Sequence, residues 1–172
     1  MTGFMGIISK NHQIKNNFDI TINSVTQRIE NIIVIGNCWF KRSIINKFVD
    51  DKLFIENSGF FICIEGIILN ANSLMNILKV RDIFDLIVCL YNKHPSNFPL
   101  YLRGDFSGAI YDKNKDIWII FNNHLGTKPI FYYFHEIEAD FVFASELQMV
   151  VKGMRAIRSN TNLREIGAYC LL

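Results

Sequence analysis

The sequence predicts an α+β fold, on two observations about how its strand-like and helix-like segments are distributed. Short apolar segments with strand character form two groups along the chain of 172 residues. Two segments with helical character separate these groups, so helices and strands are not interleaved one for one. This clustering favours an α+β sandwich over a parallel, doubly wound sheet. No internal repeat, low-complexity segment or linker interrupts the pattern, and we therefore predict one domain.

The first group of strands is predicted from alternating polarity and from apolar runs that end at glycine or at polar residues. The predicted strands cover residues 3–9, 18–23, 31–36, 52–57 and 60–66. Ser58-Gly59 lies between the last two, and this pair is typical of a tight turn. We therefore expect those two strands to form a hairpin.

Two helices follow the first strands, and each is preceded by a residue type that caps helices. Asn72 is predicted to cap a helix over 73–80, and Asp82 a second helix over 83–94. Pro95 ends the second helix. One apolar stripe runs along it at the spacing of a helix face, through Phe84, Ile87, Val88 and Tyr91. This stripe is expected to face a core.

The second group of strands again consists of apolar runs between polar turns. The predicted strands cover residues 106–112, 116–123, 129–135 and 140–145. Ser145 is predicted to cap a short helix over 146–152, which Gly153 closes. Residues 161–172 have a helical pattern.

Composition and charge exclude several classes of function. Half of the residues are apolar and 15 are Phe, which is typical of a folded domain. The formal net charge is only +2 and no long basic stripe occurs, so we expect no nucleic-acid partner. No signal peptide and no apolar run of about 20 residues is present, so we expect no membrane partner.

The four cysteines favour a reducing compartment. No two of them form a Cys-x-x-Cys pair, and they lie in apolar segments: Cys38, Cys63, Cys89 and Cys170. Buried free thiols are therefore expected, although a disulfide stays open. We predict a cytoplasmic protein.

Several motifs that carry chemistry are absent or weak. The histidines lack ligand spacing, so we expect no metal site: His12, His94, His124 and His135. The sequence has no P-loop spacing and no Gly-x-Ser-x-Gly elbow. The tripeptide Arg103-Gly104-Asp105 matches an adhesion motif, but its apolar flanks favour a structural turn at the start of a strand.

Two polar segments point to a site. Glu65 places a carboxylate in an apolar strand directly before Gly66, where a charge needs a partner or a solvent-facing edge. It is therefore either an exposed strand end or a residue that lines a cleft. The second segment, 122–133, is an Asn-, Gly- and Pro-punctuated loop between two apolar strands.

Taken together, five segments in order resemble the N-terminal glutamine amidotransferase domain of asparagine synthetase and its relatives. The matching segments are 3–9, 64–74, 100–112, 122–133 and 141–151. The last 75 residues or so match well, and 10–55 match poorly. Within these segments the family's structural motif positions are occupied by Arg103, Gly104, Gly126, Lys128, Pro129, Ser145 and Glu146.

The resemblance implies the class II amidotransferase fold of the N-terminal-nucleophile hydrolases. That fold is a four-layer αββα sandwich of two stacked antiparallel sheets. In active members an N-terminal Cys attacks the glutamine amide, with its own α-amino group as base. The ammonia released then travels to a synthetase domain.

This sequence departs from the family at the positions that carry the chemistry. Thr2 stands at the nucleophile position, and Glu65 stands where an Asn supplies an oxyanion-stabilising amide. Ile83 replaces the Asp that binds the substrate α-amino group. Arg42 is a weak counterpart of the family's arginine loop, and Asn122-Asn123 replaces an Arg-Asp pair. Gly66 is retained beside Glu65, and these departures count against glutamine as a ligand.

The resemblance also implies how the chain is organised. Residues 1–158 correspond to the amidotransferase domain, and 159–172 to the start of a connection to a synthetase domain. No Ser-Gly-Gly-x-Asp-Ser loop is present, so we expect no cofactor in this chain. ATP and Mg²⁺ are expected only on a synthetase-like partner domain or chain.

Three hypotheses for the function follow. The first is a glutaminase-inactive domain that serves as scaffold and partner of an ATP-dependent, amide-forming half, which in some relatives modifies peptides. The second is an active hydrolase or amidotransferase with Thr2 as N-terminal nucleophile, a variant that this chemistry accepts. The third is a ligand-binding module in which Glu65 favours a cationic group.

Overall fold

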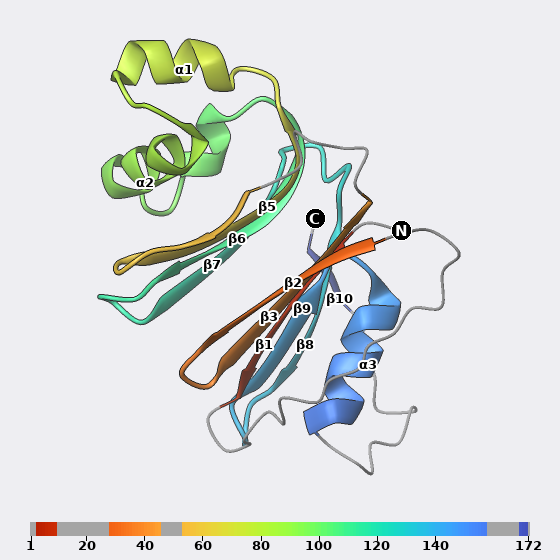
Figure 1. The fold of residues 1–172 in the computed structure, drawn as a ribbon. Helices are drawn as coiled ribbons and strands as arrows, with labels where there is room; N and C mark the ends of the chain where they lie inside the picture. The colour runs from red at the N-terminus through yellow and green to blue at the C-terminus, as the bar shows by residue number, and fades with distance from the viewer. Residues whose placement is uncertain (1–2, 10–27, 46–52, 158–168, 172) are drawn as a thin grey trace. The chain divides into compact units, whose positions relative to one another are not determined.

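The computed structural model describes residues 3–9, 28–45, 53–157 and 169–171 (Figure 1). The predicted strand over 18–23 lies outside the described residues. The chain forms two compact units. The first unit is built from residues within 1–48 and 130–171, and the second from 49–129. Each unit is described by itself below.

The first unit contains a six-stranded antiparallel sheet with the strand order β10-β8-β9-β1-β3-β2. Its members are β1 (Gly3–Ser9), β2 (Arg28–Ile35), β3 (Cys38–Ile45), β8 (Ile130–His135), β9 (Asp140–Ala144) and β10 (Tyr169–Leu171). The predicted opening strand is thus confirmed, and it lies inside the sheet between β3 and β9.

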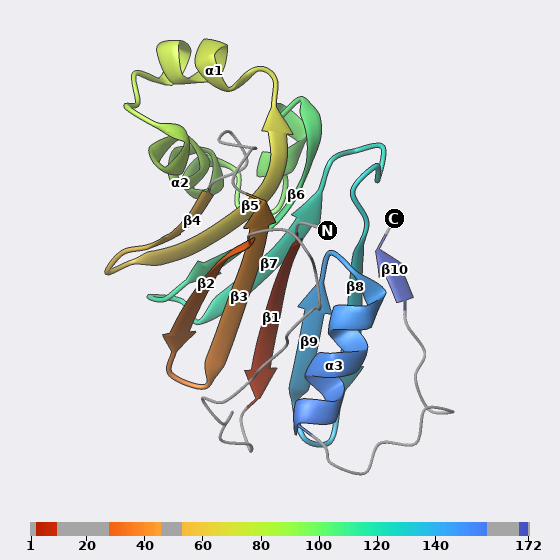
Figure 2. The ribbon, with the colours of Figure 1, turned by 45° about the vertical axis from the view of Figure 1, so that its right-hand side comes forward.

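Helix α3 (Leu147–Ile157) packs against β9, β8 and β1 (Figure 2). Apolar residues of the strands and of the helix share this core: Met5, Ile7, Trp39, Val142, Ala144, Met149, Val150 and Met154. The prediction that Gly153 closes the helix is wrong, because α3 continues to Ile157. Gly153 instead allows a close approach, since a Cβ there would lie 2.7 Å from Cγ1 of Val142.

Two further elements of the first unit differ from the sequence-based expectation. Strand β3 lies outside the predicted strands, and its Lys41 and Arg42 are buried although charged. The helical pattern over 161–172 is wrong for Tyr169–Leu171, which form β10 and pair with β8. Pairing with a sheet edge outweighs a local helical pattern in so short a segment.

The second unit contains a four-stranded antiparallel sheet with the strand order β4-β5-β6-β7. The strands are β4 (Leu53–Glu56), β5 (Phe60–Ile68), β6 (Gly104–Asp112) and β7 (Ile117–Asn122). Two helices, α1 (Ala71–Leu78) and α2 (Ile83–Lys93), and a 3₁₀ turn over Phe98–Tyr101 connect β5 to β6. The predicted hairpin of β4 and β5 is confirmed.

Both helices of the second unit lie on the same side of its sheet (Figure 1). The predicted cap of α2 is confirmed, because Oδ1 of Asp82 accepts a hydrogen bond of 2.8 Å from the backbone N–H of Asp85. The cap predicted at Asn72 is wrong, because α1 begins at Ala71 after Asn70. The Asn70 side chain instead joins the helix to the backbone before β6, at Tyr101 and Arg103.

The described residues thus form two antiparallel sheets and three α-helices, which confirms the α+β class. The stacking of the sheets into four layers stays a prediction, as do the domain boundaries at residue 158. Among the helices that the structure describes, none is both long and apolar enough to span a bilayer.

Candidate functional site

Glu65 and Gly66 lie near the C-terminal end of β5, which is one of the two inner strands of the second unit's sheet. Ile62 and Ile64 contact the core beneath the helices, so the alternation of a strand directs Glu65 to the opposite face. In the strand register Glu65 pairs with Ser107 on β6, and Ser107 with Asn122 on β7. Three polar residues therefore form a row across three neighbouring strands.

The Glu65 carboxylate is buried and has a cationic neighbour. Only 9% of the residue is exposed, which excludes the exposed-strand-end interpretation. Its Oε1 lies 3.7 Å from Nζ of Lys128, which comes from the loop after β7. Burying a carboxylate is costly without such compensation. The structure therefore brings together two residues that the sequence analysis placed in separate motifs.

Gly66 is required by the backbone geometry next to Glu65. Its φ angle is +108°, a value that residues with a side chain rarely adopt. A Cβ would overlap the backbone carbonyl oxygen of Asp105 and lie 2.9 Å from Cε of Lys128. The glycine thus lets β5 and β6 approach closely where Lys128 reaches Glu65.

The loop that carries Lys128 is held by Asn123, which is 3% exposed. Its Nδ2 donates to the carbonyl oxygen of Gly104 at 2.9 Å and to Oγ1 of Thr127 at 2.7 Å. Its Oδ1 accepts from the backbone N–H of Thr127 at 3.0 Å. Thr127 in turn donates its hydroxyl to Oδ1 of Asp105 at 2.5 Å. Both ends of the loop are therefore tied to the start of β6.

Replacing Asn123 by aspartate, the residue that the family pattern has there, is expected to destabilise this chain. A carboxylate cannot donate to Gly104, and it would compete with Asp105 for the single hydroxyl proton of Thr127. We expect a loss of about 1–3 kcal/mol in the free energy of unfolding, measured by urea denaturation. The exposed Asn114→Asp is the matched control, and an equal loss in both variants would contradict this role of Asn123.

The remaining predicted motif residues of the second unit have structural roles. Nη1 of Arg103 donates to the carbonyl oxygens of Leu100 and Leu102, at 2.7 and 3.2 Å. Gly104 then begins β6, which agrees with a structural turn rather than an adhesion motif. Gly126 has φ +64° and donates its N–H to Asn123, within the turn that precedes Pro129.

Three predicted residues that the structure describes belong to the first unit. Arg42 is 3% exposed and lies opposite Phe4 of β1, on the sheet face away from α3. Oγ of Ser145 accepts from the N–H of Phe4 at 3.1 Å instead of capping α3. The carbonyl oxygen of Glu146 accepts the first hydrogen bonds of α3, from Met149 and Val150. Thr2 lies outside the described residues.

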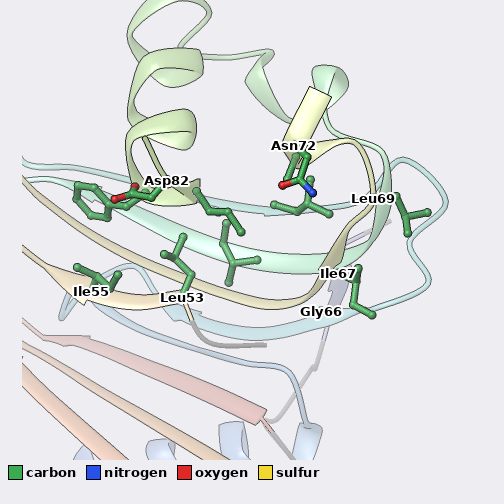
Figure 3. Close-up of a pocket in the computed structure, with 12 residues that line it drawn as sticks. Leu53, Ile55, Gly66, Ile67, Leu69, Asn72 and Asp82 are labelled. Carbon is green, nitrogen blue, oxygen red and sulfur yellow. The ribbon is translucent and has the colours of Figure 1, made fainter. Parts of the chain in front are cut away.

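Ile83, at the first position of α2, lines a pocket of about 530 Å³ (Figure 3). The pocket lies at the start of both helices and over the β4–β5 end of the sheet. Ile83 contributes an apolar wall where the resemblance implies an anchor for an ammonium group. An apolar side chain offers no charge to pair with such a group.

Sequence reasoning assigned no role to Ser107 and Thr127, and it interpreted Asp105 only as part of a structural turn. Ser107 and Asp105 are ordinary strand residues, and only the register of β5 and β6 places them beside Glu65 and Gly66. An Asn side chain commonly hydrogen-bonds to the backbone a few residues further along a turn. The spacing of Asn123 and Thr127 fits this pattern, which is the sequence signal for their contact. The described ranges hold no group of three His, Cys, Asp or Glu residues arranged for a metal ion.

A comparison against protein families agrees with the fold. Residues 42–152 match the model of a family described as "Glutamine amidotransferase domain". This match covers well over half of the chain, and the chain belongs to that family. The resemblance seen in the sequence motifs is therefore confirmed.

A curated relative gives a more specific comparison than the family model. Over 120 residues the chain is 28% identical to "Asparagine synthetase [glutamine-hydrolyzing] 2" of Bacillus subtilis (strain 168). The aligned part is 66% of this chain and 16% of that relative. The chain is thus a glutamine amidotransferase domain related to asparagine synthetase, and it spans a small part of the relative's length.

Proposed function

We propose that this domain does not hydrolyse glutamine and acts as the scaffold of an ATP-dependent, amide-forming partner. The observation that carries the proposal is the buried Glu65 carboxylate, with Lys128 at 3.7 Å. An oxyanion site needs hydrogen-bond donors, whereas an ionised carboxylate only accepts. Glu65 would therefore repel the negative charge that develops when an amide is attacked.

The wall formed by Ile83 supports the same proposal. Glutamine carries an ammonium group, and binding it away from water requires an acidic partner. The resemblance implies an Asp at this position, and Ile83 supplies only apolar surface. Loss of the oxyanion donor would remove transition-state stabilisation. Loss of the acidic anchor at position 83 would weaken glutamine binding in the family's mode, although the neighbouring Asp82 supplies a carboxylate to the same pocket.

The first test is glutamate release from L-glutamine by the purified chain. Mass spectrometry of the same sample establishes whether Thr2 has a free α-amino group. We expect no release above that of Thr2→Ala. Turnover that depends on Thr2 would contradict the proposal and favour the active hydrolase.

The second test restores the family residues in the background of Thr2→Cys. Adding Glu65→Asn and Ile83→Asp to Thr2→Cys is expected to raise glutamate release. The oxyanion donor alone accounts for a factor of about 10² to 10³ in related chemistry. Glu56→Asn is the control for Glu65→Asn, because Glu56 pairs with Lys113 elsewhere in the second unit. An equal rate with either Asn substitution would argue against the assigned role of Glu65.

Lys128 is the one observation that favours an active hydrolase. Its ammonium lies beside Gly66, where a positive charge would stabilise an oxyanion if Glu65 moved away. In that case Lys128→Met would abolish a Thr2-dependent reaction. The same glutamate assay therefore distinguishes the two candidates.

The partner is proposed from the relative, whose name describes a glutamine-hydrolysing asparagine synthetase. We propose that a synthetase-like domain or chain supplies ATP, Mg²⁺ and the amide-forming step in the cytoplasm. Cysteines outside disulfides suit that compartment, and the described residues include Cys38, Cys63 and Cys89 in this state. Affinity purification of the tagged chain from its own cells, followed by mass spectrometry, is expected to recover an ATP-binding protein of this class.

A further inference from the structure

The pocket beside Ile83 has the size and lining of a small-molecule site. Its volume of about 530 Å³ lies within the range of about 300–1,000 Å³ typical of ligand pockets. All twelve lining residues belong to the second unit. Nine of them are apolar: Leu53, Ile55, Ile64, Ile67, Ile68, Leu69, Ala71, Ile83 and Phe84.

Large aliphatic side chains stay exposed around this pocket. Ile55 is 43% exposed, Ile67 is 55% exposed and Leu69 is 77% exposed. Figure 3 shows Ile67 and Leu69 toward one end of the pocket and Ile55 and Leu53 toward the other. Covering exposed apolar surface is favourable, and exposed apolar side chains around a pocket favour a binding site.

The polar part of the lining is acidic. Asp82 is the only charged residue among the twelve, and Asn72 is the other polar one. Oδ1 of Asp82 is occupied by the N–H of Asp85, which leaves Oδ2 for another donor. Asp82 is exposed at the start of α2, where the helix dipole favours negative charge. The lining would thus attract an ammonium group and repel a carboxylate.

We propose that this pocket binds a compact aliphatic amine. Its hydrocarbon part lies against the isoleucine and leucine side chains, and its ammonium group lies at Asp82. The inference is independent of the proposed loss of glutaminase activity, because its readout is binding. It assigns a ligand class to a region where the family resemblance implies the polar amino acid glutamine.

The test titrates the full chain with unbranched alkylamines of four to eight carbons, followed by nuclear magnetic resonance shifts. Hexan-1-ol and hexanoate are the matched probes of the head group. We expect affinity to rise about fourfold per methylene until the pocket is filled, since each buried methylene contributes about 0.8 kcal/mol. Hexylamine is expected to bind more tightly than hexan-1-ol, and hexanoate most weakly.

Two pairs of variants locate the binding. Asp82→Asn keeps a cap residue on α2 but removes the charge, and is expected to reduce the preference for amine over alcohol by up to about fivefold. Asp85→Asn, in the same helical turn but outside the lining, is its control. Ile67→Asn is expected to weaken the binding of all three probes severalfold. Ile117→Asn, at a similarly exposed position on β7, is expected to weaken the binding of none of them.

The proposal is overturned if no amine binds saturably. It is equally overturned if hexanoate binds as tightly as hexylamine, or if Ile117→Asn weakens binding as much as Ile67→Asn. Glutamate release is measured separately and does not enter these outcomes. Binding of amines by a chain that also hydrolyses glutamine would support this inference and contradict the proposed function.

Discussion

Replacing Gly66 by alanine is expected to unfold the second unit or to lower its stability by about 4 kcal/mol. A side chain at φ +108° costs about 1–3 kcal/mol, and overlap with a packed neighbour costs a similar amount. Here the neighbour is the backbone carbonyl of Asp105, which cannot move without separating β6 from β5. A loss of this size is a large part of the stability of an ordinary domain.

Hydrogen exchange followed by mass spectrometry measures this effect, because its peptides report on each unit separately. Peptides from β5 and β6 are expected to lose protection in Gly66→Ala. Gly36→Ala is the control, since Gly36 also has a positive φ, of +55°, but nothing within 4 Å of the Cβ position. It is expected to cost only about 1–2 kcal/mol. Equal losses of stability in both variants would show that φ, rather than the close approach, decides the result.

The close approach at Gly66 also explains why the family pattern keeps this glycine while Glu65 differs from the family residue. A Cβ at Gly66 would break the sheet, so the glycine is needed for folding whatever the chemistry. Glu65 points to the sheet face away from the helices, where its side chain does not decide the strand pairing. The backbone therefore restricts position 66 to glycine, whereas it does not restrict the side chain at position 65.

The strands and helices that the sequence predicted well are those whose periodicity agrees with their burial. The helix over 83–94 was predicted almost to the residue, since an apolar stripe, a cap and a proline act together. Strand β3 was missed because it buries Lys41 and Arg42. Lys41 tolerates this position through an ion pair of 2.8 Å with Glu30 on β2. No pattern in the sequence around Lys41 indicates that Glu30 is its partner.

The candidate site was predictable only as separate motifs. Glu65 stood out as a carboxylate in an apolar strand, and the loop that carries Lys128 stood out by its turn residues. Their ion pair depends on the register of β5, β6 and β7 and on the hydrogen bonds of Asn123. Helices α1 and α2 connect β5 to β6, so no short turn in the sequence fixes the register of these two strands. The pocket likewise requires side chains from β4, β5, α1 and α2 to meet.

Asp112 is the second position at which a single substitution is expected to have a large effect. The residue is 2% exposed at the end of β6, and its Oδ2 accepts from the hydroxyl of Tyr91 on α2 at 2.9 Å. The same oxygen lies 3.0 Å from Nζ of Lys115, and Oδ1 accepts from the N–H groups of Asn114 and Lys115. One carboxylate thus joins α2 to the turn between β6 and β7.

Asp112→Asn is expected to lower the free energy of unfolding by about 3 kcal/mol at neutral pH. The amide nitrogen that replaces Oδ2 cannot accept from Tyr91 or Lys115, and hydrogen bonds to charged groups contribute about 1.5–3 kcal/mol each. The expected loss includes only part of the contribution of the ion pair between Asp112 and Lys115, because Lys115 is half exposed. Urea denaturation is the measurement, and Glu56→Gln is the control. The Glu56 side chain is 36% exposed against 3% for that of Asp112, so its pair with Lys113 is expected to contribute less than about 1 kcal/mol.

The same carboxylate predicts how stability depends on pH. Burial alone would raise the pKa of Asp112, but the hydrogen bonds from Lys115 and Tyr91 outweigh burial and hold the pKa below its usual value. The folded state therefore binds the proton less tightly than the unfolded state. The contribution of Asp112 is complete above about pH 4, near the pKa of an unfolded aspartate, and is lost as pH falls through the lower folded value. We expect the stability difference between the native chain and Asp112→Asn to shrink in this acid range, and a constant difference down to pH 2 would show that Asp112 acts through packing instead.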